Sequence, residues 1–204
     1  MGFLSATHSL SRYHIEGKFE NRVMENIQTG LTKNAIPTME SEYEEISAGW
    51  VPFESPYNPD FQKFSFSFGT HFVFSLRIDK KSIPAKLVQK HMAIEIEKKK
   101  EKTGRDFISK NEKGEIKEMV TDMLMQKMPS VPNVYDILWN YEEENLLLFT
   151  TQKAVNEFFE TIFFKSFNLK PVRIFPYTLI EKKSLFNAQD KDKILTLSPL
   201  KLKR

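Results

Sequence analysis

Residues 64–78 alternate between apolar and polar side chains, and this period of two is the strongest constraint that the chain places on its fold. A period of two is typical of a β-strand with one buried face. One strand of this length would run about 50 Å at about 3.3 Å per residue, far beyond the usual strand of about 5–6 residues. We therefore expect a tight hairpin turn at Gly69 and Thr70. The apolar set, which we expect on one buried face, is Phe64, Phe66, Phe68, Phe72, Phe74, Leu76 and Ile78.

Further patterns predict helices and strands in mixed order around this hairpin. Apolar residues at helical spacing predict one helix over residues 18–31 and another after Thr151, which is placed to cap it. Strands are expected at residues 3–15, "VYDILWNY", "NLLLFTT" and "KPVRIFPYTL", and an acidic loop that ends in "AGWVPF" is expected after the first helix. The mixed order predicts an α+β fold with antiparallel or mixed sheets and packed helices. Eighteen Phe residues predict a largely aromatic core.

The segment "IEKKKEKTGRDFISKNEKGEIKE" predicts a charged helical hairpin that projects from this fold. One helix begins near Ser82 and Pro84 and runs to Gly104. A second begins at the capping box formed by Ser109 and Glu112. We expect residues 1–80 and 130–181 to form a central α+β domain, 81–129 an inserted helical hairpin subdomain, and 182–204 a basic C-terminal tail.

The hairpin concentrates positive charge, although the chain as a whole carries a net charge of only +3. Its lysines alternate with glutamates, and spacings such as that of Glu95 with Lys99 also stabilise an exposed helix that binds nothing. The pattern is therefore compatible with a solvated hairpin or with a phosphate-binding surface. The basic residues concerned are Lys98, Lys99, Lys100, Lys102, Arg105, Lys110, Lys113 and Lys117.

Motifs for catalysis or cofactor binding are not found in the sequence. There is no cysteine, the four histidines lack metal-site spacing, and no phosphate-binding glycine loop or nucleophile elbow occurs. The densest carboxylates are residues 142–144 and Asp190 with Asp192, which we interpret as a solvated hairpin tip and part of the tail. We expect no cofactor, no metal and no small-molecule substrate. With neither a signal peptide nor a long apolar segment, we also expect an intracellular protein without a membrane partner.

Taken in order, several segments resemble the bacterial recombination-associated RdgC family, in particular its shorter members. They are "GWVPF", "FSLRIDKKSIPAKLVQKH", "TGR", "EKGEIKEMVTDMLMQKMPS", "VYDILWN", "LLLFTT" and "FFKSFNLKPVRIFPYTL", and together they span most of residues 1–180.

The resemblance implies a non-enzymatic protein that binds double-stranded DNA largely independently of sequence. It also implies a homodimer that surrounds or clamps DNA, restrains RecA-type strand exchange and works at the bacterial nucleoid in the cytoplasm. Phosphate contacts are then expected from the basic residues above and from Lys127. The alternatives are a metal-dependent exonuclease, a label that this family has carried, and a self-associating interaction module built on the apolar stripe of the hairpin.

Two departures limit what the resemblance implies. Longer relatives have a further C-terminal region after the last matched strand, where this chain has a short basic tail. Longer relatives also carry an aromatic residue near the end of the second hairpin helix, where this chain has Pro129 in "QKMPS". A wedge-like role for that aromatic side chain therefore does not transfer.

Overall fold

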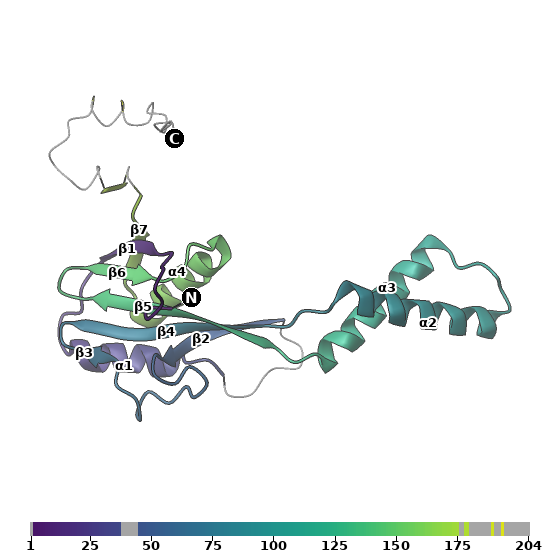
Figure 1. Ribbon diagram of the computed structural model, residues 1–204, viewed down its shortest axis with the longest axis horizontal. Helices are drawn as coiled ribbons and strands as arrows, with labels where there is room; N and C mark the ends of the chain where they lie inside the picture. Colours follow the sequence, from purple (N-terminus) through teal and green to yellow (C-terminus); the bar gives the residue numbers. More distant parts are fainter. Residues whose placement is uncertain (1, 38–44, 176–177, 180–188, 190–192, 194–204) are drawn as a thin grey trace.

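The computed structural model describes residues 2–37, 45–175, 178, 179, 189 and 193, and the predicted tail therefore lies almost entirely outside the described residues. The described part confirms the α+β prediction: helices pack on a curled antiparallel sheet (Figure 1). The strands are β1 Ser11–Glu16, β2 Ile46–Pro52, β3 Ser67–Phe68, β4 His71–Lys80, β5 Val131–Asn140, β6 Asn145–Leu148 and β7 Lys170–Arg173. The helices are α1 Val23–Lys33, α2 Ala85–Thr103, α3 Lys110–Lys127 and α4 Lys153–Phe167.

The sheet has the strand order β2-β4-β5-β6-β1-β7, with β3 pairing β4 as a short hairpin. Each pairing between these strands is antiparallel. β4 and β5 form its long central ribbon, paired from His71↔Asn140 to Lys80↔Val131. Because α2 and α3 connect these two paired strands, the helical hairpin is carried at the end of the ribbon.

One face of the sheet is buried beneath α1 and α4, and its core is aromatic as predicted. Trp50 and Trp139 are fully buried, and the Trp139 ring lies 5.1 Å from that of Phe163 on α4. Gly30 lets α1 approach α4 closely, because a Cβ at this position would lie 2.6 Å from the Phe167 ring. The α4 residues on the buried stripe are Val155, Phe159, Phe163 and Phe167.

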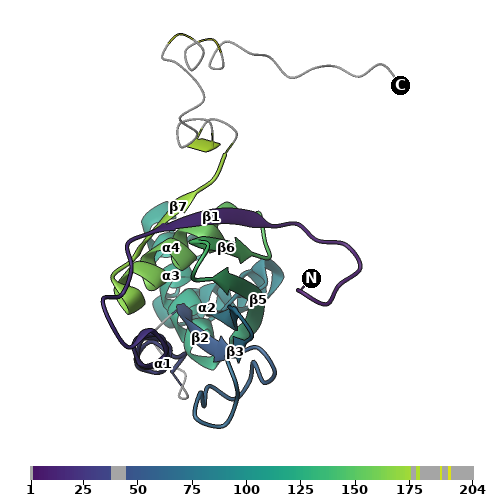
Figure 2. The same ribbon diagram turned by 90° about the vertical axis from the view of Figure 1, so that its left-hand side faces the viewer.

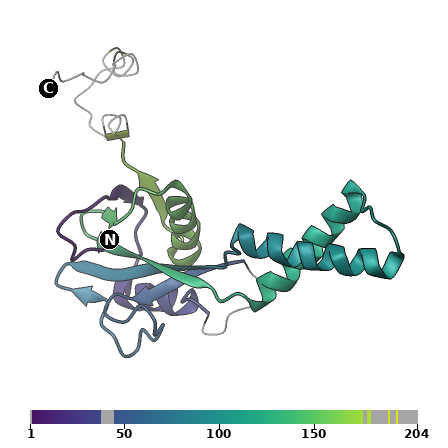
Figure 3. The same ribbon diagram turned by 45° about the vertical axis from the view of Figure 1, so that its right-hand side comes forward.

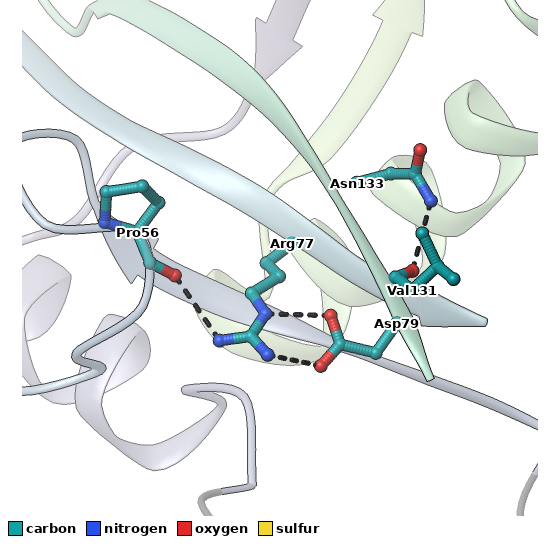
Figure 4. A network of polar contacts seen from close by, with 5 residues as sticks. All are labelled: Pro56, Arg77, Asp79, Val131 and Asn133. Atoms are coloured by element: carbon teal, nitrogen blue, oxygen red, sulfur yellow. Dashed lines mark hydrogen bonds and ion pairs between the residues drawn. The ribbon is translucent and has the colours of Figure 1, made fainter. Parts of the chain in front are cut away.

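The other face of the sheet is covered by the N-terminal segment and by the loop after β2. The Phe3 backbone N–H donates to the Asp136 carboxylate at 2.7 Å, which holds the N-terminal segment against β5. In Figure 4, the Arg77 guanidinium forms two hydrogen bonds with Asp79 and reaches the Pro56 carbonyl. The Arg77 guanidinium also lies 5.6 Å from the centre of the Tyr57 ring. The ion pair lies within β4, and the contacts of Arg77 with Pro56 and Tyr57 tie the loop to that strand.

The predicted turn at Gly69 and Thr70 is present, but Phe68 does not lie on the buried face expected for the apolar set. Phe68 pairs with His71, and Gly69 has φ +62°. Because two residues form the turn, Phe68 shares a face with its partner His71 rather than with Phe72. Phe68 therefore lies on the His71 face and is 43% exposed, whereas Phe72 is buried in the core.

Several local predictions differ from the structure. The strand expected over residues 3–15 begins only at Ser11, and the strand expected over "KPVRIFPYTL" ends at Arg173. The first helix begins at Val23 rather than near residue 18, because Arg22 has φ 53° and interrupts helical geometry. Thr151 does not cap α4: Gln152 occupies the cap position without a side-chain cap. The acidic loop was expected to continue through "AGWVPF", but residues 46–52 form β2, in which Gly49 lies against the backbone of Ile36.

Candidate nucleic-acid interface

The α2–α3 hairpin projects from one end of the sheet and has a small core of its own (Figures 1 and 3). Seen from the opposite end of the molecule, both helices lie behind the sheet (Figure 2). Ile116, Val120 and Leu124 of α3 are buried against the partly buried Val88, Met92 and Ile96 of α2. The apolar stripe that could have packed against a second copy is thus largely buried inside the hairpin.

The start of α3 is held by the predicted capping box. The Ser109 hydroxyl accepts the Glu112 N–H at 3.2 Å, and the Ser109 N–H donates to the Glu112 carboxylate at 2.9 Å. The same carboxylate lies 3.3 Å from the ammonium group of Lys99 on α2. Hydrogen bonds from Ser109 and then from Lys99 lower the pKa of Glu112 to about 2. Glu112 is therefore ionised and joins the two helices near the tip.

Two of the predicted DNA-binding lysines are engaged in ion pairs within the hairpin. Lys99 pairs with Glu112, and Lys98 lies 2.7 Å from the carboxylate of Glu95. A groove of about 390 Å³ runs between the helices on this side. Its charged lining is mixed in sign, which weakens its attraction for phosphate. The groove is lined by Glu95, Lys98, Lys99, Lys102, Glu115, Ile116 and Met119.

The opposite side of the hairpin carries unpaired lysines from both helices. Two residues along an α-helix rotate the side-chain direction by about 200°, so Lys113 and Lys117 point away from Glu115 and the groove. Lys100 likewise points away from Lys98 and Lys102, which line the groove. Because α2 and α3 run antiparallel, the side of α2 that carries Lys100 faces the same direction as the side of α3 that carries Lys113 and Lys117. We call this surface the basic side: Lys100, Lys110, Lys113 and Lys117.

The lysines of the basic side are available to a ligand. Lys110, Lys113 and Lys117 are exposed and Lys100 is half-buried. Within the part of the chain that the structure describes, none of the four forms an ion pair. Glu97, one turn before Lys100, is the acidic neighbour on this flank, so positive charge is in excess.

The remaining two predicted residues lie at the two ends of the hairpin. Arg105 is exposed in the loop between α2 and α3. Lys127 is the last residue of α3, about 26 Å along the helix from Lys110 at about 1.5 Å per residue. Lys127 therefore forms a separate charge near the base, and the nine predicted residues do not share one face.

Two further lysines were missed by the sequence analysis. Lys86 and Lys90 are exposed on α2, one helical turn apart, between the sheet and the predicted cluster. Their spacing from the helix start at Pro84 was visible in the sequence. They lie outside the dense run of charged residues that begins after residue 95.

The described residues contain no group of three or more His, Cys, Asp or Glu side chains placed to hold a metal ion. Glu142, Glu143 and Glu144 occupy the turn between β5 and β6, whereas Asp190 and Asp192 lie outside the described residues. No helix in the described ranges is long and apolar enough to cross a membrane.

One protein family has a sequence profile that matches this chain. The profile is described as "Putative exonuclease, RdgC" and matches residues 8–184. A search of curated proteins found no match.

Proposed function

The chain belongs to the RdgC family, a family of recombination-associated proteins, and we propose that it binds double-stranded DNA largely independently of sequence, without catalysing a reaction on it. In this proposal it acts as a homodimer that surrounds or clamps DNA at the bacterial nucleoid and restrains RecA-type strand exchange. The basic side of the hairpin is the observation that carries the proposal.

The basic side suits phosphate binding for three physical reasons. Its lysines come from two helices that brace each other, so they are presented on a stable surface. Three of them follow one flank of α3 at positions 110, 113 and 117, spaced by about one helical turn. Lysine ammonium groups act as point charges that attract phosphate without reading base edges, which accounts for binding independent of sequence.

We rank the predicted contacts by the ion pairs that they form within the hairpin. Lys98 and Lys99 already neutralise glutamates of the hairpin, and Lys102 faces a groove that contains Glu95 and Glu115. We therefore propose that Lys100, Lys110, Lys113 and Lys117 make the main phosphate contacts. Lys86, Lys90, Arg105 and Lys127 extend the positive surface toward the base and the tip.

The test is the salt dependence of duplex binding. Each phosphate contact contributes roughly −0.9 to the slope of log affinity against log salt. Lys113→Gln/Lys117→Gln removes two contacts from each protomer and four from the dimer, so it should flatten the slope by roughly 3.6. Lys33→Gln/Lys153→Gln removes the same charge from α1 and α4 and should leave the slope unchanged. Equal effects of the two pairs would show that net charge alone governs binding.

A second comparison separates the two sides of the hairpin. Lys98→Gln/Lys102→Gln removes two charges from the groove side, and it should weaken binding less than Lys113→Gln/Lys117→Gln does. The reverse order would place the DNA in the groove and overturn the ranking of contacts.

The description of the matching family makes a metal-dependent exonuclease the alternative. That function predicts shortening of end-labelled duplex by the purified protein with Mg²⁺ or Mn²⁺. Our proposal predicts retention of full-length DNA under conditions in which the protein is bound. Degradation that follows the protein through purification, and is lost on changing Glu142 and Glu143, would replace our proposal.

A further inference from the structure

The loop that joins α2 to α3 carries the most exposed aromatic ring of the described residues. This loop forms the free end of the hairpin, far from the sheet (Figures 1 and 3). Phe107 in the loop is 73% exposed, and within the described part of the chain its ring contacts neither another ring nor a cation. Tyr57, the next most exposed ring at 70%, lies against the guanidinium of Arg77. Phe107 therefore presents a large apolar surface that the described chain leaves uncovered.

The backbone on both sides of Phe107 is fixed. Gly104 ends α2 with φ +63°, a conformation that favours glycine, and Ser109 caps α3. Ile108, the residue after Phe107, is buried in the small core of the hairpin. The loop is therefore anchored through Ile108 while the Phe107 ring remains in solvent.

Positive charge surrounds the exposed ring. Residues 98–113 contain seven basic and three acidic side chains. Arg105 and Lys110 flank Phe107 and are exposed, and neither forms an ion pair with the described residues. Of the acidic residues, Glu112 is already paired with a lysine of α2. Proteins bind single-stranded nucleic acid with this combination, in which cations attract phosphates and an aromatic ring stacks on a base.

The exposed ring continues the basic side of the hairpin. Lys110 begins α3 three residues after Phe107, and Lys113 and Lys117 follow at intervals of about one helical turn. From Lys110 to Lys117 this flank extends for about 10 Å at about 1.5 Å per residue. A DNA strand bound along the basic side is therefore led toward the loop that carries Phe107.

The stacking of bases in DNA decides where such a ring binds. In an intact duplex both faces of a base are covered by its neighbours, so a side chain must unstack a step before it can insert. The cost is of the same order as the gain from one aromatic–base contact, which is worth about 5–150-fold in affinity. A single ring thus gains little on an intact duplex, whereas an unpaired base offers the contact without that cost.

We propose that Phe107 stacks on an unpaired base where duplex DNA is interrupted by a single-stranded gap, while Arg105 and Lys110 hold the flanking phosphates. The inference rests on the proposed function, because the basic side must bind the adjoining duplex. It adds a preference for the structure of the DNA and none for its sequence, since every base has a face on which a ring can stack.

Two duplexes of equal length and sequence test this preference, one intact and one with a gap of a few nucleotides in one strand. At one salt concentration, the wild-type protein should bind the gapped duplex about tenfold more tightly. Phe107→Ala should remove this difference and leave the affinity for the intact duplex unchanged. Phe107→Trp should preserve it, because the larger ring still stacks.

The matched control is Phe164→Ala, which removes a ring that is 53% exposed on α4, away from the hairpin. It should leave both affinities unchanged. An equal loss in this variant would assign the effect to general surface hydrophobicity and overturn the inference. Thermal unfolding of each variant verifies its fold.

A photochemical cross-link locates the contact directly. Iododeoxyuridine in the continuous strand opposite the gap couples on irradiation to an aromatic side chain stacked on it. Mass spectrometry should identify Phe107 as the attached residue. The intact duplex with iododeoxyuridine at the same position should give no such product.

Three results would overturn the stacking proposal. They are equal affinity of the wild-type protein for the two duplexes, a cross-link at another residue, and gap binding that Phe107→Ala does not weaken. If Phe107→Ala changed the sedimentation of the free protein but neither DNA affinity, the ring would be assigned to a protein contact instead.

Failure of this inference is distinguishable from failure of the proposed function. A protein that binds intact duplex with the expected salt slope but does not favour the gap would refute only the stacking of Phe107. A protein that cross-links through Phe107, but whose affinity for duplex ignores the basic-side variants, would refute the proposed function alone.

Discussion

The carboxylate of Glu112 at the start of α3 lies 3.3 Å from the ammonium group of Lys99 near the end of α2. Glu112 also completes the capping box with Ser109, so one side chain begins α3 and joins it to α2. A lysine expected to contact DNA is therefore part of the internal bracing of the hairpin.

Acid should loosen the hairpin through Glu112. Its pKa is lowered from the ordinary 4.5 to about 2 in the folded protein, so the stabilisation is present above about pH 4.5 and is lost as pH falls toward 2. The protection factors of amides in α2 and α3, which correct for the intrinsic pH dependence of exchange, should fall over this range. Glu112→Gln, which keeps the cap geometry but not the charge, should flatten this dependence. A variant profile that still follows the wild-type profile would assign the effect to another carboxyl group.

Gly30→Ala should destabilise the protein although alanine favours helices. The new Cβ would lie 2.6 Å from the Phe167 ring and 2.7 Å from the Ser166 carbonyl oxygen. Overpacking of this kind costs about 1–3 kcal/mol, which outweighs about 1 kcal/mol of improved helix propensity. Urea unfolding measures the net loss. Gly114→Ala on α3 has open space and should not destabilise; similar losses for both would discount close packing as the cause.

Ser166→Ala should reveal the cost of an unsatisfied buried donor. The indole N–H of the fully buried Trp50 donates to the Ser166 hydroxyl at 2.7 Å. Removing the acceptor should lower the free energy of unfolding by about 1–3 kcal/mol. Thr161→Ala removes an exposed hydroxyl from the same helix and should change stability by less than about 0.5 kcal/mol. Equal effects in chemical denaturation would contradict this account of Ser166.

Arg77→Met should be the most damaging of these substitutions. It leaves the carboxylate of Asp79, which is 5% exposed, without its bidentate partner. Breaking one side of a buried pair costs about 3–5 kcal/mol. The exposed pair of Lys153 with Glu157 offers the control, since Lys153→Met should cost at most about 1 kcal/mol. Thermal unfolding that ranks the two variants equally would show that the Arg77 pair is not protected from solvent.

Two predictions that depend only on neighbours in the chain succeeded. The two-residue turn at Gly69 and the capping box of Ser109 with Glu112 were both correct. Each depends on backbone conformations and hydrogen bonds within a few residues. β2 was missed because Gly49 and its neighbours carry little strand pattern; they pair with β4 and pass beside Ile36.

The candidate site shows the same division. The helical hairpin follows from the apolar periodicity, and its lysine content follows from the composition. The sequence alone determines both. The packing of α2 against α3 decides which lysines form no ion pair within the hairpin. That contact pairs Lys99 with Glu112 and turns Lys113 and Lys117 away from the groove. The position of Phe68 beside His71 likewise depends on strand register. The sequence determines local preferences for helices, turns and caps. The face on which a side chain lies, and the residue with which it pairs, are decided only when distant segments pack together in the tertiary structure.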